Sequence, residues 1–291
     1  MGISCDDAST NERHRKDLNG RINISVDETF KPVIEEQIKV FESSWPETDI
    51  VPHYKSEADC FRDLQSDSTR MVIVARGLNE VERKFFNNRL HYVPSYELLA
   101  FDAIAVVVNK SANDSVFTLD QLSSYLKASD RKRQVVVDNK NAGSTVRYLM
   151  DSLLKGTEFG SNVTAAESSE AVIDYVAGNK DAIGIVGISW IMGRENSSQK
   201  ESLSRVKTAL LECRSCEPGT FARPSQATIS TGQYPLYRGL YYILKENATG
   251  PGGNFAGFMK YERGQLIFRR AQLVPARMQF NNRLTDISEE E

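Results

Sequence analysis

Apolar and polar positions alternate along the N-terminal part of the chain in blocks that predict strands and helices in turn. Residues 21–25 alternate with the period of a strand, and residues 32–41 are apolar at helical spacing with a proline in the first turn. The order repeats with a strand over 50–54, a helix over 57–65 and a strand over 70–74. Strands that alternate with helices predict a parallel sheet with right-handed crossover connections.

The alternation continues through the middle of the chain. Residues 103–109 are its most apolar strand pattern, and a helix over 118–126 has Thr118 as its cap, with Gln121 at capping-box distance. Further elements are a strand over 135–137, a helix from 144, a helix over 169–177 and a strand over 182–186.

The C-terminal third combines an irregular segment with a regular end. Residues 193–231 show no steady period, whereas residues 234–244 return to a strand-like pattern. Residues 254–261 and 264–271 have helical spacing. The whole pattern predicts an α/β protein.

Composition is that of a globular protein and limits the partners. The chain has 291 residues, 40% hydrophobic and 26% charged, which suits one large domain or two of ordinary size. Thirty-six basic residues stand against 39 acidic ones, for a formal net charge of −3. We therefore expect no nucleic-acid partner, and any anion site must come from a local arrangement of donors.

The junction after the strand that ends at Asp138 is the strongest candidate for such a site. A β-branched run stops there in a small polar turn, and a helix begins near Gly143 and Ser144. Amide hydrogens, the positive end of the helix dipole, the hydroxyls of Ser144 and Thr145 and the guanidinium of Arg147 would point to one place. Such a set of donors favours an oxyanion.

Two other strand ends supply polar groups. Ligands of open parallel sheets bind beyond the carboxyl ends of the strands. Thr29 and the amide groups around Phe30 follow the first strand, and Arg76 follows the third. Guanidinium groups and hydroxyls together suit a tetrahedral oxyanion. Each has an ordinary alternative, because hydroxyl caps are common and Arg76 or Arg147 could be a surface residue.

Enzyme chemistry has little support in the sequence. The three histidines are His14, His53 and His91, and none has a zinc-site or Gly-x-Ser-x-Gly context. Residues 250–253 lack the Lys-Ser/Thr ending of a phosphate-binding P-loop. We expect no catalytic residues, no metal and no cofactor.

The pair Cys213 and Cys216 has three readings. A single Cys-x-x-Cys with no second pair and no nearby histidine is weak evidence for zinc. A local disulfide in an oxidising compartment is preferred, and two free surface thiols are the alternative.

Several segments taken together resemble the phosphate-binding proteins of bacterial ABC importers. They lie in that family's order over nearly all of residues 20–276, and the Tyr-Pro-Leu-x-Arg stretch is the most diagnostic. The segments are residues 25–30 before a proline-started helix, the turn over 141–147, residues 182–187, residues 234–238 and residues 264–275.

The resemblance implies a type II periplasmic-binding-protein fold. In that fold two lobes, each a mostly parallel sheet flanked by helices, are joined by two crossover strands and close on the ligand. The crossovers would lie near residues 101–106 and 233–238. The expected division is a polar N-terminal tether over 1–19, lobe one over 20–104 plus 234–291, and lobe two over 105–233.

The resemblance also implies a function. The chain would be a receptor for inorganic phosphate that performs no chemistry and delivers the anion to the membrane subunits of an ABC permease. It would act as a monomer in the periplasm or cell envelope, and the membrane would be reached only through a lipid on Cys5, which follows a small residue as in a lipoprotein cleavage box. An ordinary cysteine in a disordered end is the alternative for Cys5.

Binding residues carry over only in part. Thr29 and Phe30 match the family's first hydroxyl-and-amide loop, and Ser144 and Thr145 match its Gly/Ser/Thr turn. At Arg76 the chain departs from the family, because many members have a Ser-Asp pair there, whose carboxylate accepts the hydrogen of a protonated phosphate and excludes sulfate.

Another carboxylate would therefore have to accept the ligand's hydrogen. Asp27 or Glu28 is preferred as this acceptor, and Asp138 is a third choice. If none of them serves, sulfate or another oxyanion is an alternative ligand. A ligand-sensing regulatory module is a further alternative, and an enzyme acting on phosphoesters is a weaker one.

Overall fold

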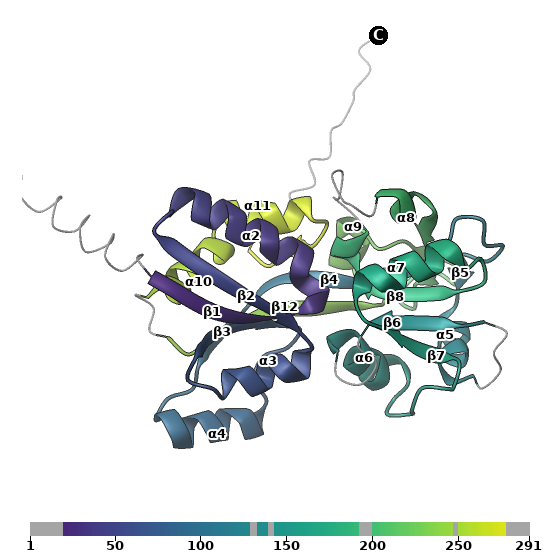
Figure 1. Ribbon diagram of the computed structural model, residues 1–291. Coiled ribbons are helices and arrows are strands. Elements are labelled where there is room, and N and C mark those ends of the chain that lie inside the picture. The colour runs from purple at the N-terminus through teal and green to yellow at the C-terminus, as the bar shows by residue number, and fades with distance from the viewer. Residues whose placement is uncertain (1–19, 129–132, 139–142, 192–199, 247–249, 278–291) are drawn as a thin grey trace, which may run out of the picture.

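A curved mixed sheet runs through both halves of the molecule and is flanked by helices (Figure 1). The computed structural model describes residues 20–128, 133–138, 143–191, 200–246 and 250–277. Along the sheet the order is β2 (Thr48–Lys55), β1 (Gly20–Asp27), β3 (Thr69–Val74), β12 (Tyr237–Leu244), β4 (Ser95–Asn109), β8 (Ile183–Gly187), β6 (Val135–Asp138) and β7 (Val163–Ala166). The predicted α/β class and two-lobed fold are confirmed.

Lobe one is built around the parallel strands β2, β1 and β3. One of its faces is covered by α2 (Lys31–Ser44), α10 (Pro251–Lys260) and α11 (Glu262–Arg270), and the other by α3 (Glu57–Leu64) and α4 (Glu80–Leu90) (Figure 1). The helix α2 forms because its apolar side chains recur at helical spacing, and Val33, Ile34 and Phe41 are buried as a result. The predicted strands and helices of residues 21–74 are confirmed.

Lobe two has the parallel strands β8, β6 and β7. Its helices are α5 (Leu119–Lys127), α6 (Ser144–Tyr148), α7 (Ser169–Gly178), α8 (Lys200–Ser204) and α9 (Gln226–Ser230). The helix α6 continues into the short π-helix η2 (Leu149–Leu153). The predicted capping box at the start of α5 is confirmed, since Thr118 Oγ1 accepts the Gln121 amide and Gln121 Oε1 accepts the Thr118 amide. On either side of this sheet lie α6 and α7 (Figure 1).

Two strands, β4 and β12, connect the lobes. The 15-residue β4 pairs with β12 over residues 95–103 and with β8 over residues 104–108, always antiparallel. It therefore changes partner between Ala103 and Ile104. The exact lobe limits at residues 104 and 233 remain a prediction.

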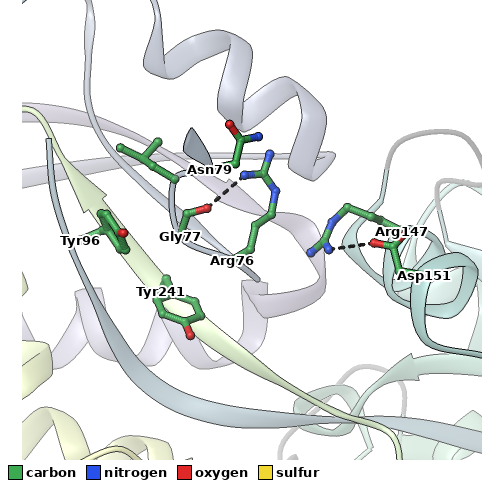
Figure 2. Close-up of a pocket in the computed structure, with 8 residues that line it drawn as sticks. Arg76, Gly77, Asn79, Tyr96, Arg147, Asp151 and Tyr241 are labelled. Carbon is green, nitrogen blue, oxygen red and sulfur yellow. Dashed lines mark hydrogen bonds and ion pairs between the residues drawn. The ribbon is translucent and has the colours of Figure 1, made fainter. Parts of the chain in front are cut away.

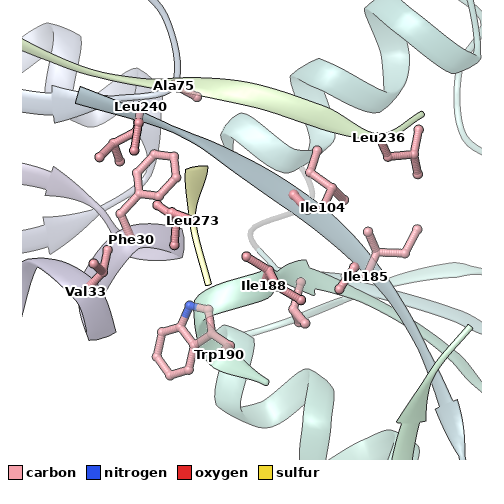
Figure 3. Close-up of a cluster of buried hydrophobic side chains, with 14 of the residues drawn as sticks. Phe30, Val33, Ala75, Ile104, Ile185, Ile188, Trp190, Leu236, Leu240 and Leu273 are labelled. Carbon is pink, nitrogen blue, oxygen red and sulfur yellow. The ribbon is translucent and has the colours of Figure 1, made fainter. Parts of the chain in front are cut away.

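Apolar contacts continue from one lobe into the other. Phe30, Leu240 and Leu273 lie on the lobe-one side of this core, and Ile188 and Trp190 on the lobe-two side (Figure 3). The Trp190 indole is almost completely buried, and its Nε1 donates a hydrogen bond to the carbonyl oxygen of Thr29 at 2.8 Å. The lobes therefore pack against each other directly.

The expectation of an irregular segment over residues 193–231 is wrong in part. That segment contains α8, β9 (Val206–Thr208), β10 (Leu210–Glu212), β11 (Phe221–Ala222) and α9, and β10 pairs with β11 and with β5 (Val116–Phe117). Strands of two or three residues are too short to show a period. A disulfide joins Cys213 and Cys216 next to β10.

Three further features were absent from the prediction. They are α4, β7 and the first eight residues of β4 before Ala103. The short 3-10 helix η1 (Glu28–Phe30) and its counterpart η3 (Ile188–Trp190) follow β1 and β8.

Two expectations concern the membrane. Within the described ranges, no helix combines the length and the apolar character that a bilayer crossing requires. The proposed tether over residues 1–19 and the lipid-bearing Cys5 lie outside the described residues.

Candidate ligand-binding site

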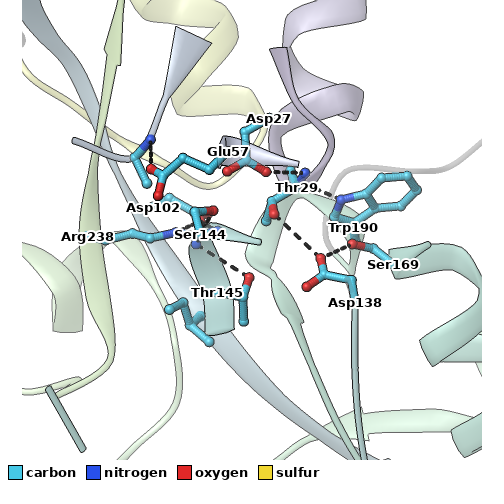
Figure 4. Close-up of polar contacts among 12 residues, drawn as sticks. Asp27, Thr29, Glu57, Asp102, Asp138, Ser144, Thr145, Ser169, Trp190 and Arg238 are labelled. Carbon is cyan, nitrogen blue, oxygen red and sulfur yellow. Dashed lines mark hydrogen bonds and ion pairs between the residues drawn. The ribbon is translucent and has the colours of Figure 1, made fainter. Parts of the chain in front are cut away.

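The guanidinium of Arg238 is the centre of a buried polar cluster at the junction of the lobes (Figure 4). The side chain is 2% exposed, and its Nε and Nη2 donate to Asp102 Oδ2 at 3.2 and 3.1 Å. From the same guanidinium, Nη1 donates to Ser144 Oγ at 2.7 Å and to Thr145 Oγ1 at 3.4 Å. Arg238 therefore links the connecting strands to the start of α6.

Lobe one contributes the end of β1 and the turn of η1. Asp27 is the last residue of β1, and its Oδ1 accepts the Thr29 amide at 3.0 Å, which caps η1. Asp27, Thr29 and Phe30 are buried. The Phe30 ring centroid lies 4.9 Å from the Arg238 guanidinium carbon. A polar loop and an aromatic ring thus lie beside the buried cation.

Lobe two contributes the end of β6 and the first turns of α6 and α7. Ser169 Oγ lies 2.8 Å from Asp138 Oδ2 and 3.1 Å from Glu28 Oε2, and its hydroxyl can donate to either. Thr29 Oγ1 donates to the same Asp138 oxygen at 3.4 Å. These contacts join the two lobes across the site.

The turn before α6 is only partly described. Residues 139–142 lie outside the described residues, whereas Gly143 is the N-cap of α6 and is buried with Ser144 and Thr145. Amides in the first turn of a helix have no partner within the helix, so this end can present donors to an anion.

Burial raises the pKa of four carboxyl groups in the cluster, those of Asp27, Glu28, Asp102 and Asp138. The pKa of Asp27 and that of Asp102 rise to about 6, although the positive charge of Arg238 opposes the rise. Burial, with the charge of Asp138 as the next contribution, raises the pKa of Glu28 to about 7. Burial also raises the pKa of Asp138, against a hydrogen bond from Ser169. The site therefore holds groups that can exchange protons near neutral pH.

Three carboxylate oxygens in the cluster are available as acceptors. The buried oxygens that have no hydrogen-bond partner among the residues that the structure describes are Asp27 Oδ2, Asp102 Oδ1 and Asp138 Oδ1. Leaving a buried carboxylate oxygen unpaired is costly, so each is suited to an O–H group of a ligand.

Arg147 does not contact Ser144 or Thr145 through its guanidinium, contrary to expectation. Its Nε donates to Glu57 Oε2 at 2.6 Å, and its Nη1 lies 3.5 Å from Asp151. The position on α6 explains this placement, because the side chain leaves the helix toward α3 of the other lobe.

Arg76 is also directed elsewhere. Both of its terminal nitrogens donate to the Glu82 carboxylate at 2.8 Å, and the guanidinium stacks 3.8 Å from the Phe61 ring centroid. Arg76 and Arg147 line a separate open cleft of about 550 Å³ (Figure 2). The expectation that Arg76 is the cation beside the hydroxyls is therefore corrected, and Arg238 has that place.

Sequence reasoning missed several members of the cluster. Arg238 lay in the Tyr-Pro-Leu-x-Arg stretch that served only as a family signature, and Asp102 lay in the approach to the most apolar strand. A charged residue within a buried strand needs a charged partner, and this rule could have paired them. Three more members come from distant parts of the chain, and no local sequence pattern marked them as site residues. They are Glu57, Ser169 and Trp190.

Two lobes that enclose a buried polar site between the carboxyl ends of their strands are the architecture of the type II periplasmic-binding-protein fold. Residues 10–262 match the family described as PBP superfamily domain. The chain belongs to this family.

Known relatives are consistent with this assignment. The chain is 22% identical over 209 residues to the phosphate-binding protein PstS of Pseudomonas aeruginosa, a match that covers 65% of this chain and 61% of that protein. The chain therefore matches about three-fifths of the length of that curated relative.

Two solved structures have the same fold. One is a putative phosphate ABC transporter substrate-binding protein from Clostridium perfringens with bound phosphate, with a TM-score of 0.72, 19% identity and coverage of 88% of this chain and 99% of that chain. The other is an ABC-type phosphate transport receptor from Vibrio cholerae, with a TM-score of 0.63, 19% identity and coverage of 87% and 99%.

Proposed function

We propose that the chain is the substrate-binding receptor of an ABC importer for inorganic phosphate. The observation that carries the proposal is the Arg238 guanidinium, buried beside two hydroxyls at the start of α6 and held in place by Asp102. A fixed guanidinium and a helix start are strong oxyanion donors. The names of the relatives support phosphate as the anion.

Donors from both lobes would surround the anion. Arg238, Ser144 and Thr145 would approach it from the connecting strand and lobe two, and Thr29 with the Phe30 amide from lobe one. The amides at the Gly143 end of α6 would add backbone donors.

Carboxylate acceptors would select the protonated form of the anion. Asp27 Oδ2 and Asp138 Oδ1 are free to accept a P–O–H hydrogen, and Glu28 lies beside them. Sulfate carries no such hydrogen near neutral pH and would leave these acceptors unpaired.

Lobe closure would couple binding to delivery. The contacts of Thr29 with Asp138 and of Glu28 with Ser169 form only when the lobes are together. An anion held by donors from both lobes stabilises that closed state. The membrane permease subunits would then recognise the closed receptor and receive the anion, and no chemical step is needed.

The finer points of the proposal concern location and accessory residues. A lipid on Cys5 would hold a monomeric receptor at the cell envelope, and the Cys213–Cys216 disulfide suits an oxidising compartment. Arg147 would stabilise the closed lobes through its ion pair with Glu57. Arg76 would lie at the edge of the open cleft that it lines together with Arg147.

Titration calorimetry tests the proposal directly. We expect phosphate to bind with one site per chain and sulfate to bind about 10- to 100-fold more weakly, since a lost buried hydrogen bond costs about 1–3 kcal/mol. Equal binding of both anions would indicate a general oxyanion receptor. The absence of heat with either anion over the range from about pH 5 to about pH 9 would rule out the receptor, and turnover of a phosphoester would favour an enzyme.

A further inference from the structure

The buried site contains more acid than base. Asp27, Asp102 and Asp138 are 0–1% exposed, and Glu28 lies against Asp138. The charge that lowers the pKa of Asp27, Asp102 and Asp138 belongs to Arg238. Three buried aspartates thus share one buried guanidinium, and Glu28 adds a fourth carboxyl group beside them.

The neighbouring elements do not restore the balance. From α3, Glu57 faces Asp27 and further raises its pKa, while its charge is matched by Arg147 of α6. Tyr148 of the same helix and Cys60 of α3 have raised pKa values, so both stay neutral.

Among the residues that the structure describes, the remaining packed elements place no further charged side chain against these carboxyl groups. From α7 the site receives the Ser169 hydroxyl, and from η3 the Trp190 indole. Burial and the negative charge of Asp102 raise the pKa of Tyr234, which precedes β12, so Tyr234 also stays neutral.

An incoming anion makes the imbalance worse. If all four carboxyl groups were ionised, a phosphate dianion would add two negative charges to a site that already has three in excess. Acidic groups a few Å apart in a buried site cannot all stay ionised. The group whose negative charge is stabilised least by neighbouring donors and cations binds a proton instead.

We propose that the site takes up a proton with each oxyanion that it binds. The proton comes from the buffer and rests either on a ligand oxygen, so that the bound species is dihydrogen phosphate, or on a carboxyl group beside a more highly charged anion. In both cases the bound complex holds one more proton than the free protein and the free dianion together. The inference rests on the proposed function, because it describes how the same site accepts its anion.

Calorimetry in several buffers counts the protons. The full chain is titrated with inorganic phosphate at about pH 8, where the free anion is the dianion, in buffers of different ionisation enthalpy. The slope of the observed heat against that enthalpy is the number of protons taken up. We expect about one proton per anion and an affinity that falls about tenfold for each pH unit above neutrality, as linkage requires. A slope of zero, or proton release, would overturn the inference.

The calorimetric result distinguishes a receptor that takes up no proton from a chain that binds no phosphate. Heat with a zero slope would leave the phosphate receptor intact and remove only the proton. No heat in any buffer would remove both.

Variants identify where the proton rests. Glu28→Gln and Asp138→Asn each remove one carboxyl group, and Glu28→Gln is available if Asp138→Asn does not fold. If the proton rests on Glu28 or Asp138, the variant of that residue lowers the proton count. If it rests on phosphate, Asp27 or Asp102, the count stays near one. Asp151→Asn is the matched control, since Asp151 is exposed on η2 and pairs only at 3.5 Å with Arg147. A control that changed the count as much as Asp138→Asn would contradict the assignment to this cluster.

Discussion

Glu57 of α3 and Arg147 of α6 form an ion pair that joins the two lobes. Arg147 Nε donates to Glu57 Oε2 at 2.6 Å and Nη2 donates to Oε1 at 3.3 Å. The Glu57 side chain is 4% exposed, whereas that of Arg147 is 36% exposed. Glu57 Oε1 also accepts the Ala75 amide at 3.1 Å, which fixes the carboxylate at the end of β3. Opening the lobes would separate this pair.

Replacing Glu57 by Gln should therefore weaken the closed state. The glutamine keeps an oxygen for the Ala75 amide but loses the charge that attracts Arg147. We expect phosphate affinity to fall about tenfold, mainly through faster dissociation. Removing one partner of a buried charge pair raises the dissociation rate more than it lowers the association rate. Stopped-flow dissociation and calorimetry measure the two effects.

Glu82→Gln is the matched control for that experiment. Glu82 also forms an ion pair with an arginine, Arg76, at the edge of the open cleft. Both residues of this pair lie in the same lobe. This variant should change dissociation less than about twofold. If both variants accelerated dissociation equally, the Glu57–Arg147 pair would have no special role in closure.

Arg238→Lys should abolish most phosphate binding. Lysine cannot donate in parallel to Asp102 and to the α6 hydroxyls, so the cation would no longer be held in the binding position. We expect at least a 100-fold loss of affinity and a destabilisation of about 1–3 kcal/mol, because lysine keeps the charge but leaves buried acceptors without a hydrogen bond. Calorimetry and urea denaturation measure these changes.

A double variant separates binding from stability. Arg238→Met with Asp102→Asn removes both charges, and replacing a buried ion pair by uncharged groups can restore stability. We expect most of the lost stability to return while phosphate binding stays absent. Recovery of binding in the double variant would show that Arg238 is not a ligand donor.

Thr145→Val should weaken phosphate binding at constant shape. Valine has nearly the volume of threonine and lacks the hydroxyl, which lies 3.4 Å from Arg238 in the buried cluster. We expect an affinity loss of about tenfold, because one hydrogen bond to a charged group contributes about 1.5–3 kcal/mol. Ser152→Ala, on the exposed next turn, is the control and should bind as the unaltered chain does. Full affinity in Thr145→Val would place that hydroxyl outside the binding site.

The sequence predicted the parts of the fold that repeat a local period. β1, β3 and α2 were found because burial on one face leaves an apolar pattern in the chain. The amphipathic signal of α4 is weak, with Phe86 as its one buried residue, and the helix was missed. That omission also hid Glu82, which is the partner of Arg76 in the structure.

The candidate site was predictable only where it is local. Thr29 and Ser144 lie in the strand-to-helix junctions that follow β1 and β6, so these junctions pointed to them. The pairing of Arg238 with Asp102 spans 136 residues, and no local pattern carries that contact. Its physical cause is the antiparallel register of β12 with β4, which places the two residues opposite each other.

The free protein should be more stable in mild acid than above neutral pH. Burial raises the pKa of Asp27 and Asp102 from 3.8 to about 6 and that of Glu28 from 4.5 to about 7, so the folded chain binds protons more tightly than the unfolded chain does. Stability from these groups is fully present below the unfolded pKa values and is lost as pH rises through the folded values. Urea unfolding should give a free energy that falls between about pH 4 and about pH 7.

Asp138→Asn tests the cause of that pH dependence. The variant removes one buried carboxyl group, whose charge also raises the pKa of Glu28. Its unfolding free energy should depend less on pH over the same range, and the difference from the unaltered chain should grow toward high pH. Salt-bridged carboxylates such as Glu97, whose pKa is lowered, act with the opposite sign and only at lower pH. A stability that rose steadily from about pH 4 to about pH 7 would contradict the assignment of this pH dependence to the buried cluster.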